Sequence, residues 1–399
     1  MRLVHLSDLH LGFRQYQRLT PRGINQREVD VAQSVTRALD KVIELAPDVV
    51  LIAGDVFHQV RPTNTAILHA FIQFNRLRSA LPNAEIIMVA GNHDTPRSSE
   101  TSSILRLFTP IGVHVIDADA QALEFPHLDL SVLAVADNQH ERPKLVPPGT
   151  HRWNVLVLHG EVEGMLGTFS STREMATQEI PLEDLHASKW DYIALGHYHV
   201  YRKLGPNQFY SGATDYTSTN TWAEREEELK SGLKGKGIIE HDLETGTHTF
   251  HPLDSLRVFI DLPAISAKGR TTDEVNALIV SAVESIPDGI DDKIVRLVIR
   301  DLPRHIVRQL DHKRLREFRR RALHFQLDTR RPDPISRVSG HGSPGRRPSL
   351  AELVRDKLRE RLIPSDVDRE ALVELGVKYL KDAEDRESAS TSPVGGVDG

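Results

Sequence analysis

The chain has 399 residues, of which 39% are hydrophobic and 27% are charged, and its formal net charge is −6. This length exceeds one ordinary hydrophobic core, so we expect two or three folded units, and the apolar runs are too short to span a membrane. The chain contains no cysteine, which excludes disulfides and thiolate metal sites and confines metal ligands to His, Asp, Glu and Asn.

The first 200 residues alternate strand-like apolar runs with helical stretches, which is typical of a layered α/β domain. Because the strands are apolar on both faces, we interpret them as central strands covered by helices on each side. The N-terminus enters strand-like sequence at once, unlike a signal peptide, and we expect a cytoplasmic protein. The pattern predicts strands at 2–6, 48–53, 85–90, 113–116, 128–135, 154–158 and 192–195, with helices at 29–45, 65–81 and 102–108.

The first domain is predicted to cover residues 1–254. Its last part contains a charged segment at 221–236, which is helix or excursion, together with a strand at 209–213 and a hairpin of strands 237–242 and 247–251. A second unit, residues 255–330, has a β-α-β-α-β pattern. Its expected strands are 256–262, 293–299 and 323–327, and its expected helices are 272–286 and a basic helix at 303–321.

Residues 331–348 are rich in proline, glycine and serine and are predicted to be a linker. Two short amphipathic helices follow in residues 349–385. Ser349 and Glu352 predict a capping box before the first, and the second restarts after residues 364–365. Residues 386–399 are expected to be a disordered C-terminus.

Polar residues of one chemical kind directly follow five of the predicted strands. Sites in open α/β sheets form at the carboxyl ends of strands, so we expect these residues to meet at one edge. A single Asp-x-His or His-x-His is more often a turn, a cap or a surface pair, whereas five such segments in order are not readily accidental. The residues are Asp8, His10, Asp55, His58, Asn92, His93, Asp94, His159, His197 and His199.

Seven of these residues are predicted to hold two metal ions. Imidazole and carboxylate ligands without thiolate suit Mn, Fe or Zn better than Mg or Ca alone. Asp55 is the natural bridge between two cations about 3.5–4 Å apart, because a carboxylate has two oxygens. We assign one ion to Asp8, His10, Asp55 and His199, and the other to Asp55, Asn92, His159 and His197.

The three remaining residues at these strand ends are candidate catalytic residues. In the phosphodiester hydrolysis that two such metal ions would support, His93 would protonate or stabilise the leaving oxygen, with Asp94 orienting its imidazole. His58, one turn past Asp55, would contact a phosphate or leaving sugar; alternatively, it begins a helix and bonds locally. Other histidines, including His5 and His241, fit no ligand spacing and are interpreted as surface or satisfied core residues.

These segments resemble the motifs of the calcineurin-like metallophosphoesterase superfamily. Residues 5–12, 53–58 and 91–94 are similar to the SbcD-type nuclease subunits, and the resemblance covers roughly residues 1–330. It implies a layered sandwich of two mixed β-sheets flanked by helices, with a small α+β capping domain and a helical tail. One departure is Ser211-Gly212-Ala213, where relatives usually show Pro-Gly-Ser.

The resemblance also implies an activity. It implies a DNA nuclease with two Mn²⁺ (Mg²⁺, Fe²⁺ or Zn²⁺ being possible), a 3′–5′ double-strand exonuclease and single-strand endonuclease that is associated with the nucleoid. It implies that residues 349–385 hold an SbcC-type coiled-coil ATPase, although the tail could instead fold back on its own domain. Helices 65–81 and 102–108 resemble a homodimer surface, or are ordinary core helices. Alternatives are a phosphoesterase for small or phosphoprotein substrates and a non-catalytic scaffold for DNA ends.

Positive charge gathers in the second half of the chain. Residues 313–361 hold fifteen Lys and Arg against six Asp and Glu, which indicates contact with a polyanion. We expect Arg316, Arg319 and Arg320 to contact the DNA backbone. A solvated helix face followed by a disordered tail would give the same charge pattern.

Overall fold

The computed structural model describes residues 1–96, 102–137, 144–149, 151–163, 179–332, 349–361 and 368–390, the last of these without side chains beyond residue 381. It contains two compact units, Met1–Pro332 and Asp333–Gly399. The division falls within the predicted linker, of which residues 333–348 lie outside the described residues. So do residues 364–365, the predicted start of the second tail helix, and residues 391–399 of the predicted disordered C-terminus.

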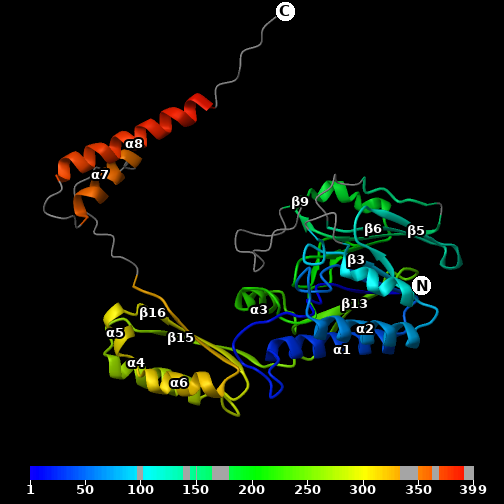
Figure 1. Ribbon diagram of the computed structural model, residues 1–399, viewed down its shortest axis with the longest axis horizontal. Coiled ribbons are helices and arrows are strands. Elements are labelled where there is room, and N and C mark those ends of the chain that lie inside the picture. Colours follow the sequence, from blue (N-terminus) through cyan, green and yellow to red (C-terminus); the bar gives the residue numbers. More distant parts are fainter. Residues whose placement is uncertain are drawn as a thin grey trace, which may run out of the picture. The chain divides into compact units, whose positions relative to one another are not determined.

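The first unit contains two six-stranded mixed sheets, seen one above the other in Figure 1. The first sheet has the order β14-β13-β1-β2-β3-β4, in which β1 to β4 are parallel and β13 and β14 are antiparallel to their neighbours. Its strands are β1 (Arg2–Leu6), β2 (Val49–Ala53), β3 (Glu85–Val89), β4 (His114–Ile116), β13 (Gly237–Asp242) and β14 (His248–Pro252).

The second sheet has the order β11-β12-β10-β7-β6-β5, with four parallel central strands and an antiparallel strand at each edge. Its strands are β5 (Gln121–Phe125), β6 (Leu130–Val135), β7 (Trp153–His159), β10 (Tyr192–Gly196), β11 (Arg202–Lys203) and β12 (Gln208–Tyr210). A short parallel pair, β8 (Glu161–Val162) and β9 (Glu179–Ile180), lies apart from it. The edge strands β5 and β11 are absent from the sequence prediction.

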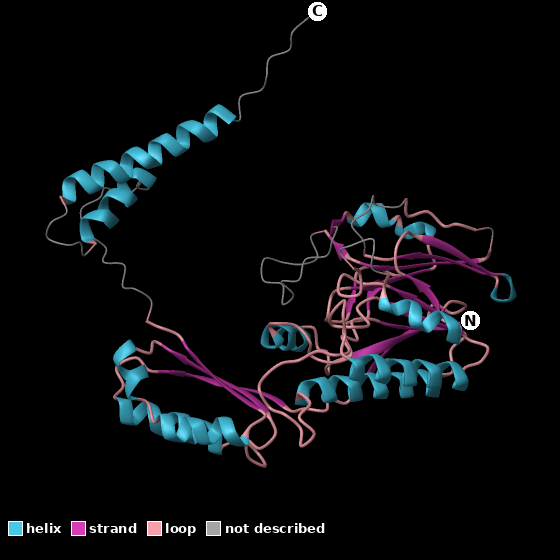
Figure 2. Ribbon diagram, viewed as in Figure 1, coloured by secondary structure: helices cyan, strands magenta, loops and turns pink. Residues whose placement is uncertain are grey.

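Helices α1 (Gln26–Leu45) and α2 (Asn64–Ala80) lie side by side against the first sheet, together with the 3-10 helix η1 (Ile104–Ile111) (Figures 1 and 2). One core joins these helices to the first sheet and to the facing side of the second. The expectation of helices on each side of the strands is therefore wrong, because each sheet has one face against the other sheet. Apolar residues on both faces of a strand indicate that both faces are covered, but not whether a helix or a second sheet covers them.

The outer face of the second sheet is covered by irregular structure. The 3-10 turns η3 (Leu182–Leu185) and η4 (Ala187–Lys189), with Trp190, contribute to its separate apolar core. Another 3-10 turn, η2 (Pro126–Leu128), delays the start of β6 to Leu130. Helix α3 (Thr221–Lys230) occupies the first part of the charged segment 221–236.

Residues 259–329 form a parallel three-stranded sheet with helices and a hydrophobic core of its own. The Thr271–Glu274 capping box begins α4. The predicted helix 303–321 is two helices, because the backbone is extended at Leu310 and the Asp311 side chain caps the second one. The elements are β15 (Phe259–Ser266), α4 (Thr272–Glu284), β16 (Ile294–Arg300), α5 (Arg304–Gln309), α6 (His312–Arg321) and β17 (His324–Thr329).

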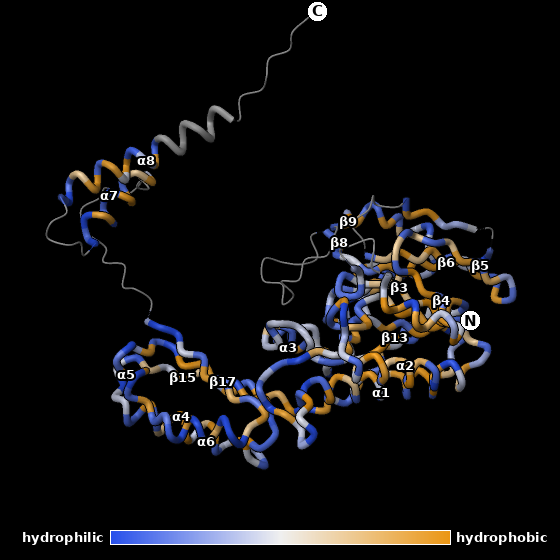
Figure 3. The backbone as a smooth tube through the Cα atoms, in the orientation of Figure 1, coloured by the Kyte–Doolittle hydropathy of each residue, from blue (hydrophilic) through white to orange (hydrophobic). Residues whose placement is uncertain are grey.

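The second unit contains helices α7 (Leu350–Glu360) and α8 (Arg369–Ser390), which contact each other. The Ser349–Glu352 capping box is present at the start of α7, as predicted. Figure 3 shows apolar segments along these helices, and Leu350 and Leu353 are about half exposed, at 55% and 48%. No helix in the described part of the chain is long and apolar enough to cross a membrane.

Candidate metal centre

The carboxyl ends of β1, β2 and β3 in one sheet and of β7 and β10 in the other meet at one edge of the sandwich. The loops that leave β1 and β2 stay paired, with Asp8 N donating to Gly54 O at 3.0 Å and His10 N to Asp55 O at 2.9 Å. All seven predicted ligands lie at this edge, and the paired loops hold Asp8, His10 and Asp55 there.

The four residues assigned to the first ion lie together. His10 Nε2 is 3.0 Å from His199 Nε2 and 3.7 Å from Asp55 Oδ2. His199 Nε2 is 4.0 Å from Asp8 Oδ1. The side chains of all four are buried.

The residues assigned to the second ion meet around one amide oxygen. Asn92 Oδ1 is 3.0 Å from His159 Nε2 and 3.3 Å from His197 Nδ1. Asp55 Oδ2 is 3.4 Å from His159 Nε2, so one carboxylate oxygen borders both sets of ligands. A carboxylate oxygen of Asp8 also lies within 4.8 Å of the atoms of Asp55 and His159 that could bind a metal ion. Asp55 therefore occupies the position that a bridging ligand requires.

The electrostatics of the buried edge suit cations. Burial raises the pKa of Asp8 to about 7 and lowers the pKa of His10 and of His199 well below the usual value. Asp55 is buried as well, but the charge of His159 holds its pKa well below the usual range. The Asp55 carboxylate in turn outweighs burial and raises the pKa of His159 to about 10. The neutral imidazoles of His10 and His199 offer lone pairs beside the Asp55 carboxylate, and this donor set fits a divalent metal ion.

Backbone strain is concentrated at the same edge. Asp8, His10, Asp55 and His197 have left-handed backbone angles, with φ of 54°, 45°, 52° and 101°. Such conformations cost on the order of 1–3 kcal/mol each in non-glycine residues and cluster at functional sites. Gly91 is required for a different reason, because a Cβ at this position would collide with the Asp55 carboxylate.

His93 is held beside the ligands by the backbone. Its Nδ1 is 2.7 Å from the carbonyl oxygen of His58, and its ring stacks on the His58 ring with centroids 5.1 Å apart. Its ring also meets the His10 ring edge-on at 4.9 Å. His58 and His93 thus lie beside His10, at the border of the first set of ligands.

The predicted role of Asp94 is wrong. Its carboxylate is fully buried and accepts hydrogen bonds from the backbone amides of Val56 at 3.0 Å, Phe57 at 2.9 Å and Gly91 at 3.1 Å. These interior N–H groups need an acceptor, and Asp94 supplies it. Asp94 therefore ties the loop after β2 to the loop after β3, and the His58 carbonyl, not Asp94, orients His93.

His58 does not lie one helical turn past Asp55, because residues 54–63 form a loop and the next helix, α2, begins only at Asn64. The loop runs beside the loop after β1, and His58 N donates to Leu11 O at 3.0 Å. The His58 side chain points to the site, with its Nδ1 3.3 Å from His10 Nδ1. Both sequence interpretations of His58 placed it on a helix, and that part of each is wrong.

Three buried charges beside the site are absent from the sequence prediction. Lys236 Nζ donates to Glu224 at 2.6 Å and to the carbonyl oxygen of His199 at 2.7 Å, and it pairs with Glu228 at 2.8 Å. Burial alone would lower the pKa of Lys236, but the two carboxylates raise it above the usual value. The only sequence signal was the spacing of four between Glu224 and Glu228, which places them on one face of α3.

Ser211, where the motif departs from its relatives, adds a polar contact. Its Oγ is 2.8 Å from Ser7 Oγ, and Ser7 donates to the Asp8 carboxylate. Both serines are buried. The substitution therefore extends the hydrogen bonds behind Asp8 and displaces none of the predicted ligands.

The structure places the three predicted DNA-contacting arginines on α6. Arg316, Arg319 and Arg320 are exposed and form no ion pair with any described residue, whereas Arg314 and Arg321 on the same helix are paired with acidic side chains. Two of the three border a hollow of about 690 Å³, lined by Tyr16, Gln17, Arg18, Arg319, Arg320, Leu323, His324 and Phe325.

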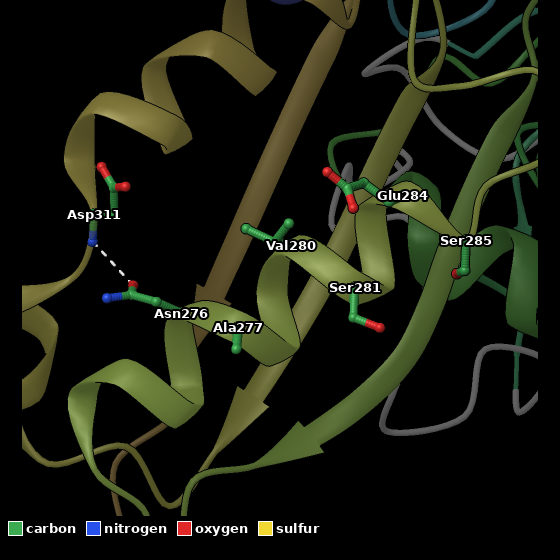
Figure 4. Close-up of a pocket in the computed structure, with 7 residues that line it drawn as sticks. All are labelled: Asn276, Ala277, Val280, Ser281, Glu284, Ser285 and Asp311. Atoms are coloured by element: carbon green, nitrogen blue, oxygen red, sulfur yellow. Dashed lines mark hydrogen bonds between the residues drawn. The ribbon is translucent and has the colours of Figure 1, made fainter.

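A second hollow, of about 630 Å³, lies on the outer side of α4 (Figure 4). Asp311 N donates to Asn276 Oδ1 across it at 2.9 Å. Its charged lining residues, Glu284 and Asp311, are acidic, so this face does not suit a polyanion.

A buried edge of Asp, Asn and His between two mixed sheets defines the class of metal-dependent phosphoesterases. The chain belongs to the calcineurin-like phosphoesterase family, whose sequence model matches residues 1–224. The family and the two-sheet architecture predicted from the motifs are thereby confirmed.

Curated relatives share a name. The chain is 27% identical over 240 residues to the DNA double-strand break repair protein Mre11 of Methanocaldococcus jannaschii. The alignment covers 58% of this chain and 61% of that protein. It is 28% identical over 245 residues to the protein of the same name from Sulfolobus acidocaldarius, and this alignment covers 59% of this chain and 58% of that protein. The matched region spans about three fifths of these relatives.

Proposed function

We propose that this chain is the nuclease subunit of a machine that processes DNA double-strand breaks. It would act as a 3′–5′ double-strand exonuclease and a single-strand endonuclease. The observation that carries this proposal is the position of Asp55, whose Oδ2 borders both sets of ligands at 3.7 Å from His10 and 3.4 Å from His159. The names of the curated relatives support DNA as the substrate.

The metal centre would hold two Mn²⁺, with Mg²⁺, Fe²⁺ or Zn²⁺ as the alternatives. Asp8, His10, Asp55 and His199 would hold one ion, and Asp55, Asn92, His159 and His197 the other. A pair of divalent cations, when bound, supplies the positive charge and the acidified water that phosphodiester hydrolysis needs at neutral pH.

His93 would protonate or stabilise the leaving oxygen. The His58 carbonyl accepts the hydrogen of His93 Nδ1, which fixes the ring and assigns proton transfer to Nε2. The His58 ring, stacked on His93, would contact the phosphate or the leaving sugar. Asp94 holds the two loops that carry these groups.

We assign DNA hydrolysis to residues 1–254 and DNA binding to a capping domain at 255–330. The arginines Arg316, Arg319 and Arg320 support this division, since they are exposed and unpaired within the described chain and can neutralise backbone phosphates. An enzyme that processes DNA ends needs no base-specific contacts, and phosphate contacts suffice to position the duplex.

We assign two protein contacts to exposed apolar surfaces. The exposed Leu350 and Leu353 of α7 favour the tail, residues 349–385, as the segment that holds an SbcC-type coiled-coil ATPase. On α2, Leu68 and Ile72 are 61% and 52% exposed, and Leu107 of η1 is 37% exposed, which favours these helices as a homodimer surface.

The proposed function is tested with the purified chain, end-labelled duplex DNA and Mn²⁺. We expect wild-type protein to shorten the duplex, and Asp55→Asn to reduce cleavage by roughly a thousandfold, because losing the bridge removes several kcal/mol of charge stabilisation. Asp191→Asn is the matched control, since Asp191 lies before β10, where its carboxylate accepts a hydrogen bond from Asn154 N. Hydrolysis of a nitrophenyl phosphodiester without DNA cleavage would favour a small-molecule phosphoesterase, and equal cleavage by Asp55→Asn would refute the metal assignment.

A further inference from the structure

We infer that Glu224 is a positioning residue that fixes the imidazole of His199 through its Nδ1 atom, and that Lys236 holds Glu224 in place. This inference rests on the proposed function, since it concerns His199 as a metal ligand. It assigns a role in the metal centre to α3, an element that contributes none of the proposed ligands.

The two nitrogens of His199 face different surroundings. Nε2 points into the proposed ligand cluster, 3.0 Å from His10 Nε2 and 4.0 Å from Asp8 Oδ1. Nδ1 is buried on the other side of the ring and has no hydrogen-bond partner. The charged atom that faces it is Glu224 Oε1, at 3.6 Å.

Metal binding at one ring nitrogen decides the state of the other. When Nε2 of a histidine is a ligand, the ring hydrogen sits on Nδ1, and a buried N–H requires an acceptor. His159 meets this need with the carbonyl oxygen of Ala53, 2.9 Å from its Nδ1. Glu224 is in place to do the same for His199, and an approach of a few tenths of an ångström would bring 3.6 Å within hydrogen-bond range.

Glu224 is held where this role requires it. Its side chain is fully buried, and it accepts hydrogen bonds from Ser218 Oγ at 2.6 Å and from Lys236 Nζ at 2.6 Å. Lys236 also donates to the carbonyl oxygen of His199 at 2.7 Å, so one ammonium group ties the carboxylate to the backbone of the ligand it faces. An ion pair with a purely structural role would have no need to face an imidazole nitrogen.

Glu228 provides a matched control. It lies one turn further along α3, is also buried, and pairs with the same Lys236 at 2.8 Å, while its other oxygen accepts from the Tyr216 hydroxyl. Removing either carboxylate leaves Lys236 with the other one. Glu224→Ala and Glu228→Ala therefore make similar changes in charge and burial, and only Glu224→Ala removes the group facing Nδ1.

The test measures Mn²⁺ binding to the full chain by isothermal titration calorimetry, with bound metal counted by elemental analysis. We expect Glu224→Ala to weaken binding of one Mn²⁺ by roughly ten- to a hundredfold, as loss of a ligand's hydrogen-bond partner does. Glu224→Gln, which keeps one acceptor oxygen, should recover part of this loss, and Glu228→Ala should stay within about twofold of wild type. DNA cleavage by Glu224→Ala should recover when Mn²⁺ is raised.

Wild-type affinity in both Glu224 variants would overturn the inference, as would an equal loss in Glu228→Ala. Should Glu224→Ala fail to fold, which thermal unfolding without metal would reveal, Glu224→Gln decides alone, and about threefold weaker binding is expected. A different result would contradict the proposed function, namely that the wild-type protein binds no pair of Mn²⁺ ions or leaves DNA intact.

Discussion

The edge that carries the proposed metal ligands and the outer face of α6 both concentrate charged groups, but in opposite ways. At the edge, Asp8, His10 and Asp55 are at most 1% exposed, and each has fixed polar neighbours at hydrogen-bond or ion-pair distance. On α6, Arg319 and Arg320 are exposed, and no described residue pairs with them. Buried groups interact in a medium that screens little, whereas water and salt screen the exposed ones.

The difference teaches what each region can contribute. Fixed, desolvated groups can stabilise one arrangement of reacting atoms, so a single change there should alter chemistry in a large step. Exposed cations attract a polyanion without fixing its position to a fraction of an ångström, so changes there should be smaller, additive and dependent on salt. Three predictions test this contrast.

The largest effect is expected from His93→Ala. The residue borders the ligands without being assigned to either ion, and loss of general acid catalysis typically costs about a hundred- to ten-thousandfold in rate. We expect kcat for DNA cleavage to fall by that factor while two Mn²⁺ remain bound, measured by single-turnover kinetics and metal analysis. Loss of metal in this variant would instead make His93 a ligand.

The next effect concerns pH and the buried His5 of β1. Burial, then the nearby His248, lowers its pKa to about 3, and its Nδ1 is 3.1 Å from the Tyr192 hydroxyl. Between pH 6.5 and pH 3, His5 binds a proton in the unfolded chain but not in the folded chain. The contribution of His5 to the free energy of unfolding is therefore complete above pH 6.5 and is lost as the pH falls toward 3. At pH 4.5 the loss amounts to up to roughly 3 kcal/mol.

Urea unfolding at pH 7 and pH 4.5 checks this expectation. His5→Gln, which does not titrate, should lose less stability than wild type between the two pH values. His305→Gln on α5 is the control, since His305 is exposed and its replacement should leave the difference unchanged. An identical pH dependence in wild type and His5→Gln would contradict the contrast between buried and exposed groups.

The smallest effect is expected on α6. Replacing Arg316, Arg319 and Arg320 together by Ala should weaken DNA binding and reduce the slope of log K against log salt by about 3, since each phosphate contact contributes about 0.9. Binding is measured without metal by fluorescence anisotropy from 50 to 200 mM salt. Cleavage at saturating DNA should persist.

Arg321→Ala is the control for these arginines, because its guanidinium is already engaged by Asp291 at 2.7 and 3.0 Å. It should change the slope by much less than one. A triple variant with the wild-type slope would remove α6 from the DNA surface, and loss of cleavage at saturating DNA would show that the two regions are not separable.

The site was predictable to the extent that it follows strand ends. Asp8 and Asp55 lie two residues past the apolar strands β1 and β2, and His159 ends β7. Parallel strands bring such residues to one edge whatever the details of packing. Asp94 was misjudged because proximity in sequence to His93 does not say where a side chain points. Its orientation is set by three backbone amides from two loops, which no local pattern reveals.

Glu224 and Lys236 also show that a local sequence pattern does not reveal which side chains are buried. Their segment was predicted only as a charged helix or excursion, yet both residues are buried, and Lys236 pairs with Glu224 and Glu228 behind His199. A segment whose charges form buried ion pairs has the same amino-acid composition as a segment whose charges are solvated, so composition does not distinguish the two. The predicted helix 303–321 failed for a local reason, since Asp311 starts a new helix within it.

The sequence by itself determined most of the strands along the chain, the polar residues that follow them and the capping box at Ser349, because these depend on neighbours within a few positions. The tertiary structure alone decided that the His58 carbonyl orients His93 and that Glu224 faces His199. Each of these joins segments far apart in the chain, and such contacts depend on which surfaces exclude water together rather than on any local pattern.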